Sequence, residues 1–292
     1  MIMRFVVIGD LHGVKPKIYY QTYDAIIAPG DFCSSDKIRN YMFKVIEERK
    51  KDRNYDKEWY DLVGKRRARK LVKESLEIGR EVLEYLDSLE VPIYLVPGNA
   101  DWVYQSKDWN FLNKDYFEDY LIKGLKNVVN CHEKFVPVNE ELGIVGYGLS
   151  SNPELPQHTE DMAMLTPELF EKKEKEYNEQ KEILCEAFRE RRKGKFKRRV
   201  IFLSHNIPFN TNLDIIRNKK TSRNGQHRGS LIARELVETY KPIICIGGHM
   251  HEHFGACKIG RTTVINAGFG ENVNVWLEIN DMKKKVEFYK GN

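Results

Sequence analysis

Residues 4–13 read RFVVIGDLHG, an apolar run that ends abruptly in glycine, aspartate and histidine. A short run rich in β-branched residues and closed by glycine predicts a buried β-strand. Similar runs predict strands at residues 25–28, 92–96, 142–147, 200–204, 243–246, 261–266, 273–279 and 286–289. Charged segments with helical spacing separate the earlier runs. This alternation predicts an α/β protein with mixed sheets and helices outside them.

Apolar residues recur at intervals of three and four between Ala68 and Leu89 and predict one long amphipathic helix. Thr166 stands as N-cap before Pro167, which predicts a second helix ending near Gly194. A third helix is expected from about residue 230 to 240. We expect a single domain over residues 1–292, with helical insertions at about 36–90 and 152–198.

The composition excludes several classes of protein. The chain has 292 residues, of which 41% are hydrophobic and 31% charged, so it can bury a sizeable core. Lys+Arg 48 against Asp+Glu 43 gives a net charge of +5. No apolar run approaches the roughly 20 residues that cross a bilayer. The 5 cysteines are scattered without CxxC spacing, which disfavours a disulfide framework and indicates a cytoplasmic, globular protein without a membrane partner.

Metal-ligating residue types follow several of the predicted strands directly. In open α/β sheets, ligands collect at the carboxyl ends of the strands, so these loops are expected to converge on one place. The residues concerned are Asp10, His12, Asp31, Asn99, His205, His249 and His251.

This donor set has a definite chemical preference. Oxygen and nitrogen donors of intermediate hardness suit Mn, Fe, Co, Ni or Zn better than Ca or Mg. Seven side chains exceed the roughly three that one catalytic ion needs. Two ions about 3.5–4 Å apart with one shared carboxylate would use them all. The sequence therefore predicts a dinuclear centre of divalent transition metals.

The motifs together resemble the calcineurin-like metallophosphoesterases. The resemblance rests on Asp10-x-His12, Gly30-Asp31, Gly98-Asn99-x-Asp101, His205 and Gly248-His249-x-His251. Segments 205–208, 212–214 and 227–230 are similar to the Icc-related branch of that family. The resemblance implies a four-layer α/β/β/α sandwich of two mixed β-sheets flanked by helices. It also implies a hydrolase in which a metal-bound hydroxide attacks a phosphoric ester.

The same resemblance distributes the ligands between two ions. It gives one ion the side chains of Asp10, His12, Asp31 and His251. It gives the other the side chains of Asp31, Asn99, His205 and His249, with Asp31 bridging. Two divalent ions, two aspartates and a hydroxide sum to +1, which attracts a phosphate anion. We expect Mn before Fe, Zn, Co or Ni, and a phosphate-ester small molecule or nucleotide as substrate.

One position departs from the family pattern. Many relatives have histidine where this chain has Ala100, and alanine cannot protonate a leaving group. We therefore expect phosphodiesters or activated esters as substrates, with His227 or His253 as alternative proton donors unless these are surface or packing residues. Asp101 is expected either to orient a metal ligand, and so to be counted with the catalytic residues, or to cap a helix ahead of Trp102.

Two rival functions remain open at this stage. Basic runs at residues 65–70 and 189–199 could bind nucleic-acid phosphates and make the protein a nuclease acting on DNA or RNA, or they could be solvated helix faces. The protein could also be a metal-binding scaffold with little catalysis. The oligomeric state cannot be read from the sequence.

Overall fold

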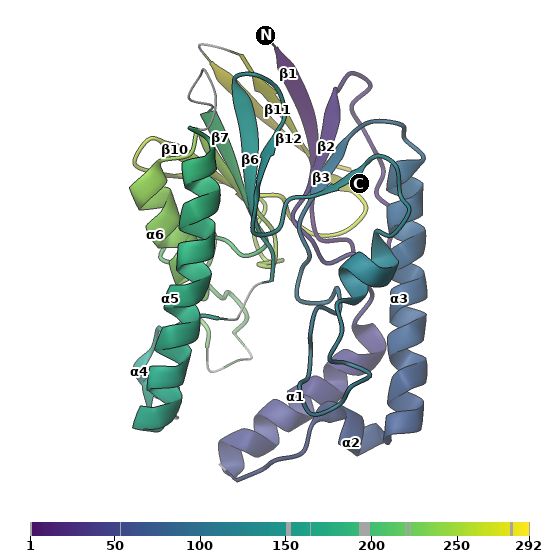
Figure 1. Ribbon diagram of the computed structural model, residues 1–292, viewed down its shortest axis with the longest axis vertical. Helices are drawn as coiled ribbons and strands as arrows, with labels where there is room; N and C mark the ends of the chain where they lie inside the picture. Colours follow the sequence, from purple (N-terminus) through teal and green to yellow (C-terminus); the bar gives the residue numbers. More distant parts are fainter. Residues whose placement is uncertain are drawn as a thin grey trace.

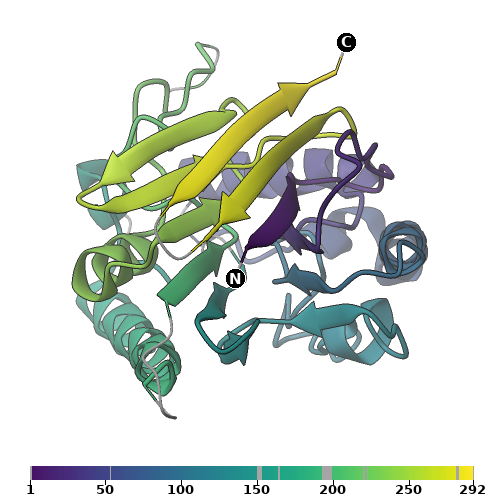
Figure 2. The ribbon, with the colours of Figure 1, turned by 90° about the horizontal axis from the view of Figure 1, so that it is seen from above.

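The computed structural model describes residues 2–52, 54–149, 153–163, 165–192, 199–219, 221, 223–280 and 283–291. Two mixed six-stranded sheets form its centre (Figures 1 and 2). The first has the order β12 (Lys284–Lys290), β11 (Val273–Ile279), β1 (Met3–Ile8), β2 (Ala25–Ala28), β3 (Ile93–Leu95) and β4 (Val128–Asn130). The second has the order β5 (Phe135–Pro137), β6 (Leu142–Tyr147), β7 (Arg199–Ser204), β8 (Ile244–Gly247), β10 (Thr262–Asn266) and β9 (Gly255–Ile259).

Helices lie outside both sheets. On the side of the first sheet are α1 (Asp36–Lys51), α2 (Trp59–Val63), α3 (Lys65–Asp87) and a π-helical turn, η1 (Phe117–Leu121). On the side of the second are α4 (Thr159–Met162), α5 (Pro167–Glu190) and α6 (Leu231–Tyr240). No helix among the described segments is long and apolar enough to cross a membrane.

Three hydrophobic clusters separate four layers. Alternate side chains of β1 point to opposite faces, so Phe5 and Val7 join the cluster between the sheets while Val6 and Ile8 join the cluster under α3. On the second sheet, Phe202 of β7 packs in a third cluster beneath α5 and α6. The central strands of both sheets are therefore covered on both faces, which is why they read as continuous apolar runs. The predicted four-layer α/β/β/α sandwich is confirmed.

The helix signals in the sequence correspond to real caps. The Thr166 side chain accepts a hydrogen bond from the Leu169 amide at 3.3 Å, and Pro167 begins α5. The Ser230 hydroxyl accepts one from the Ala233 amide at 3.0 Å and begins α6. The predicted end of α5 near Gly194 lies outside the described residues.

Strand direction explains where polar loops gather. β1, β2, β3 and β4 run parallel, and so do β6, β7, β8 and β10. The loops after β1, β2, β3, β7 and β8 therefore leave their sheets at one edge, which faces downward in Figure 1. α1–α3 and α4–α5 extend past this edge on opposite sides.

Helix α3 packs closely against the loop that follows β2. A β-carbon added at Gly79 would overlap Cys33 Sγ and lie 3.1 Å from Cys33 Cα, and Cys33 is completely buried. Overpacking costs about 1–3 kcal/mol, more than the roughly 1 kcal/mol by which alanine favours a helix over glycine.

We expect Gly79→Ala to lower the free energy of unfolding, measured by urea denaturation. Glu77→Ala, on the exposed side of α3, is the control; equal or higher stability of Gly79→Ala would contradict the packing argument.

Candidate metal centre

Four side chains form a first group at the sheet edge. Asp10 and His12 follow β1, Asp31 follows β2 and His251 follows β8, and one ligand atom from each lies within 4.8 Å of the others. His12 Nε2 is 3.3 Å from His251 Nε2 and 3.3 Å from Asp31 Oδ2. His251 Nε2 is 3.1 Å from Asp10 Oδ2. Four potential ligand atoms thus point at one small volume.

A second group shares Asp31 with the first. Asp31, His205 and His249 also place ligand atoms within 4.8 Å of one another. The Asn99 side-chain oxygen lies 3.1 Å from His205 Nε2 and 3.0 Å from His249 Nδ1. All seven side chains singled out in the sequence therefore meet at one place, contributed by loops of both sheets.

Asp31 has an unusual electrostatic position because its side chain is buried. Burial alone would raise its pKa, but the neighbouring His205 and His12 and the Ala100 amide, 2.7 Å from Oδ1, outweigh burial and hold the pKa well below its usual range. The same pairing works in reverse on His12. Burial would lower the pKa of that imidazole, but Asp31 and Asp10 raise it to about 9. The two carboxylates thus create a strong local preference for positive charge.

Three residues of the two groups have strained backbones. φ is +45° at His12, +57° at Asp31 and +60° at His249, a region that side chains other than glycine rarely adopt. Such conformations cost about 1–3 kcal/mol each and cluster at functional sites.

The donor atoms are suited to cations. Asp10 Oδ1 is buried without any hydrogen-bond partner among the described residues. His205 Nδ1 donates to the Pro29 carbonyl oxygen at 2.8 Å, which orients the ring so that Nε2 lies 3.5 Å from Asp31 Oδ2. Burial lowers the pKa of His249 to about 3, so its imidazole is neutral and able to ligate. Gly98 is needed here because any β-carbon would overlap the Asp31 carboxylate.

Asp101 supports this arrangement from behind. Its Oδ2 accepts from the amides of Asp31 at 2.8 Å and Gly98 at 2.7 Å. Its Oδ1 accepts from the amides of Phe32 at 2.8 Å and Cys33 at 3.0 Å. Burial and the nearby Asp31 raise its pKa to about 6, which these hydrogen bonds oppose.

The alternative role for Asp101, a helix cap, is wrong. Residues 102–115, all described, contain no helix, and Trp102 has a φ of +57°. The Asp101 carboxylate is turned toward the amides around Asp31 and Gly98, so it fixes the loops that carry two of the ligands.

The two histidines considered as proton donors, His227 and His253, lie outside both groups. His253 is buried and its Nε2 donates to the Ile215 carbonyl oxygen at 2.7 Å, which is a packing role. His227 is partly exposed, and its Nδ1 lies 2.7 Å from Oδ1 of the buried Asp214.

Sequence reasoning missed several supporting residues. Phe269 stacks on the His251 ring at a centroid distance of 4.3 Å. Trp102 Nε1 donates to Ser75 Oγ at 2.9 Å, and that hydroxyl donates to the Ser34 carbonyl at 2.7 Å, which ties α3 to the Asp31 loop. Phe269 lies between two glycines, but that pattern alone does not identify a partner.

The first basic run takes part in packing. Lys65 Nζ lies 5.8 Å from the centre of the Tyr60 ring and 5.9 Å from that of Trp109, and the Arg69 guanidinium lies 5.4 Å from that of Phe111. Most of the second run, residues 193–198, lies outside the described residues.

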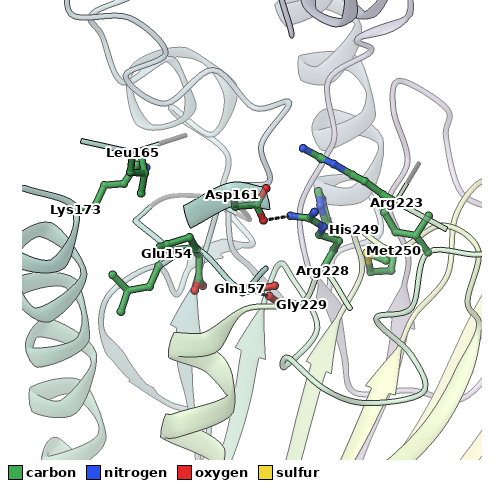
Figure 3. A pocket seen from close by; sticks show the side chains of 13 residues that line it. Glu154, Gln157, Asp161, Leu165, Lys173, Arg223, Arg228, Gly229, His249 and Met250 are labelled. Carbon is green, nitrogen blue, oxygen red and sulfur yellow. Dashed lines mark hydrogen bonds and ion pairs between the residues drawn. The ribbon is translucent and has the colours of Figure 1, made fainter. Parts of the chain in front are cut away.

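A pocket of about 370 Å³ adjoins the second group and shares His249 with it (Figure 3). Its walls come from the segment before α5, from α5 itself and from the loops before α6 and after β8. The lining residues are Glu154, Leu155, Pro156, Gln157, Asp161, Leu165, Lys173, Ile216, Arg223, Arg228, Gly229, His249 and Met250.

Comparison with known proteins shows the family to which this chain belongs. Residues 3–253 match the model of the calcineurin-like phosphoesterases, and the chain belongs to this family. It is accordingly a hydrolase acting on phosphoric ester bonds. None of the curated proteins matches the sequence significantly.

Solved structures share the fold at low sequence identity. The protein TT1561 of Thermus thermophilus is 15% identical with a TM-score of 0.53, over 98% of this chain and 99% of its own. A dimetal phosphatase from Danio rerio is 11% identical with a TM-score of 0.51, over 99% and 96%.

Asp101→Asn tests the support behind the ligands. The amide would offer one acceptor and one donor where the carboxylate offers two acceptors to four amides, so the Asp31 loop should loosen. Comparable outer partners change metal affinity by about 10–100-fold, and we expect a loss of that size. Calorimetric titration with Mn²⁺ measures it. Asp108→Asn, an exposed position on the same loop, should bind like the wild type; unchanged affinity of Asp101→Asn would refute the role.

Proposed function

We propose that the protein hydrolyses phosphodiesters or activated phosphate esters with two divalent transition-metal ions. The supporting observation is that two clusters of ligand atoms share the single carboxylate of Asp31. Asp10, His12 and His251 would hold one ion with it. Asn99, His205 and His249 would hold the other with it. Mn fits this mixed oxygen and nitrogen set, as do Fe, Zn, Co and Ni.

The reaction adds water across a P–O bond: the water oxygen joins phosphorus and the ester oxygen leaves with a proton. When bound, the ions would lower the pKa of water and neutralise charge on the phosphoryl oxygens. The residues of this chain have the task of holding seven donors in place. The hydrogen bonds of His205 to Pro29 and of Asp101 to four loop amides support that role.

We propose the preference for diesters because residue 100 is alanine, whose side chain is a methyl group. Its amide binds Asp31 Oδ1, but its side chain has no proton to give to a leaving group. Phosphodiesters and activated esters with acidic leaving groups depend least on such a donor. His227 is the better of the two proposed donors, because its Nδ1 is oriented by Asp214 while His253 is occupied by a carbonyl oxygen.

We also propose one catalytic domain over residues 1–292 with helical insertions at about 36–90 and 152–198. The continuous clusters beneath α3 and beneath α5 support this, since the insertions share cores with the sheets. A cytoplasmic location is supported by five unpaired cysteines, Cys33, Cys131, Cys185, Cys245 and Cys257.

Metal removal and a ligand variant test the proposed chemistry. We expect hydrolysis of bis(4-nitrophenyl) phosphate to cease after chelation and to return with Mn²⁺. Asp10→Asn should lower kcat/KM at least about 100-fold, because even outer partners of metal ligands are worth 10–100-fold. Asp56→Asn, at an exposed position, should be unaffected. Absence of Mn²⁺-dependent hydrolysis in the wild type would rule the proposal out.

Ala100→His tests the explanation of substrate preference. A histidine there would restore a proton donor, and general-acid catalysis contributes about 10²–10⁴-fold for poor leaving groups. We expect turnover of an alkyl phosphate monoester to rise relative to that of bis(4-nitrophenyl) phosphate. Ala100→Gln, similar in bulk but without an acid, is the control. An unchanged monoester-to-diester ratio in the histidine variant would show that the account of Ala100 is wrong.

A further inference from the structure

The pocket beside His249 is placed to receive part of a substrate. His249 belongs both to its lining and to the second group of ligand atoms, so a molecule whose scissile phosphate occupies the metal centre can extend directly into it. Its volume of about 370 Å³ falls in the range of small-molecule sites. The other walls come largely from the segment at residues 154–173, within the second helical insertion.

Two acidic side chains of the pocket are already engaged. Asp161 Oδ2 accepts from Arg228 Nη1 at 2.6 Å, an ion pair visible in Figure 3. Glu154 accepts from the Ser230 hydroxyl and from the Leu231 amide at 2.9 Å. Burial raises the pKa of Glu154 to about 7, so its charge is only partial at neutral pH. Asp161 and Glu154 therefore contribute little negative charge that could neutralise the other basic side chains of the pocket.

Two basic side chains remain uncompensated. Lys173 of α5 and Arg223 line the pocket, and neither side chain has an ion pair with any residue in the part of the chain that the structure describes. Figure 3 shows Arg223 on the side of the pocket that carries His249 and Lys173 on the opposite side. The apolar side chains of Leu155, Ile216 and Met250 also line the pocket.

We propose that this pocket binds a second phosphate group of the substrate, held by Lys173 and Arg223 and joined to the scissile phosphate by the organic body of the substrate. A dianion matches two cations that approach it from opposite sides, and the planar guanidinium can also bind phosphate oxygens in pairs. The substrate class is thus an ester carrying two phosphates. This inference rests on the proposed function, because the first phosphate is assigned to the metal centre.

Calorimetric titration of the Mn²⁺-loaded protein tests it directly. The probes are adenosine 3′,5′-bisphosphate, adenosine 5′-monophosphate and adenosine 3′-monophosphate. We expect the bisphosphate to bind at least about 10-fold more tightly than either monophosphate, the gain of one charge-assisted contact. In Lys173→Gln and Arg223→Gln this advantage should fall, and in the double variant it should disappear.

Matched controls are available nearby. Lys172→Gln on the exposed side of α5 and Arg217→Gln on the exposed loop before Arg223 should keep the full advantage. Equal binding of bisphosphate and monophosphates, or an advantage that survives in the double variant, would overturn the inference. Failure of the proposed function is separate: it would appear as absence of Mn²⁺-dependent diester hydrolysis in the wild type.

Discussion

A charged carboxylate is held at the centre of this molecule with almost no access to water. The Asp31 side chain is 2% exposed and remains ionised because two imidazoles and one amide surround it. A second carboxylate, Asp101, is fully buried directly behind it and repels it. Buried like charges are costly unless positive charge is supplied. The surrounding loops supply positive charge by placing His12 and His205 beside Asp31.

The fold meets the requirement with rigid supports. Parallel strands in both sheets end at one edge, so residues distant in sequence meet without long loops. Helix α3 then braces the Asp31 loop through Gly79 against Cys33 and through Ser75 and Trp102. Sites held by packed elements keep their geometry better than sites on unsupported loops. Helix α3 therefore takes part in organising the loops at the centre.

The sequence predicted those features that have local signals. Strands buried on both faces produce apolar runs, and the ligands follow them directly, so the sandwich and the grouping of seven side chains could be predicted. β4, β5 and β9 were missed because they are short and half-exposed, with few fully buried residues. α1 buries only Ile38 and Val45, too few to give a clear helical period. The pairing of Asp214 with His227 and the charges around the pocket depend on contacts that no local pattern contains.

The pairing of β1 with β11 has a consequence for how the protein is made. The register pairs Met3 with Ile279. The turn before β11 also binds the backbone of Asp10: the Asp10 amide donates to the Gly268 carbonyl, and the Asp10 carbonyl accepts from the Gly270 amide. The loop that carries Asp10 is therefore synthesised long before the segment that completes the pairing of its backbone. During translation the first sheet has an open edge beside β1, a template for wrong strand pairing. Residues beyond 253, outside the stretch matched by the family model, close that edge and complete the backbone pairing of the Asp10 loop.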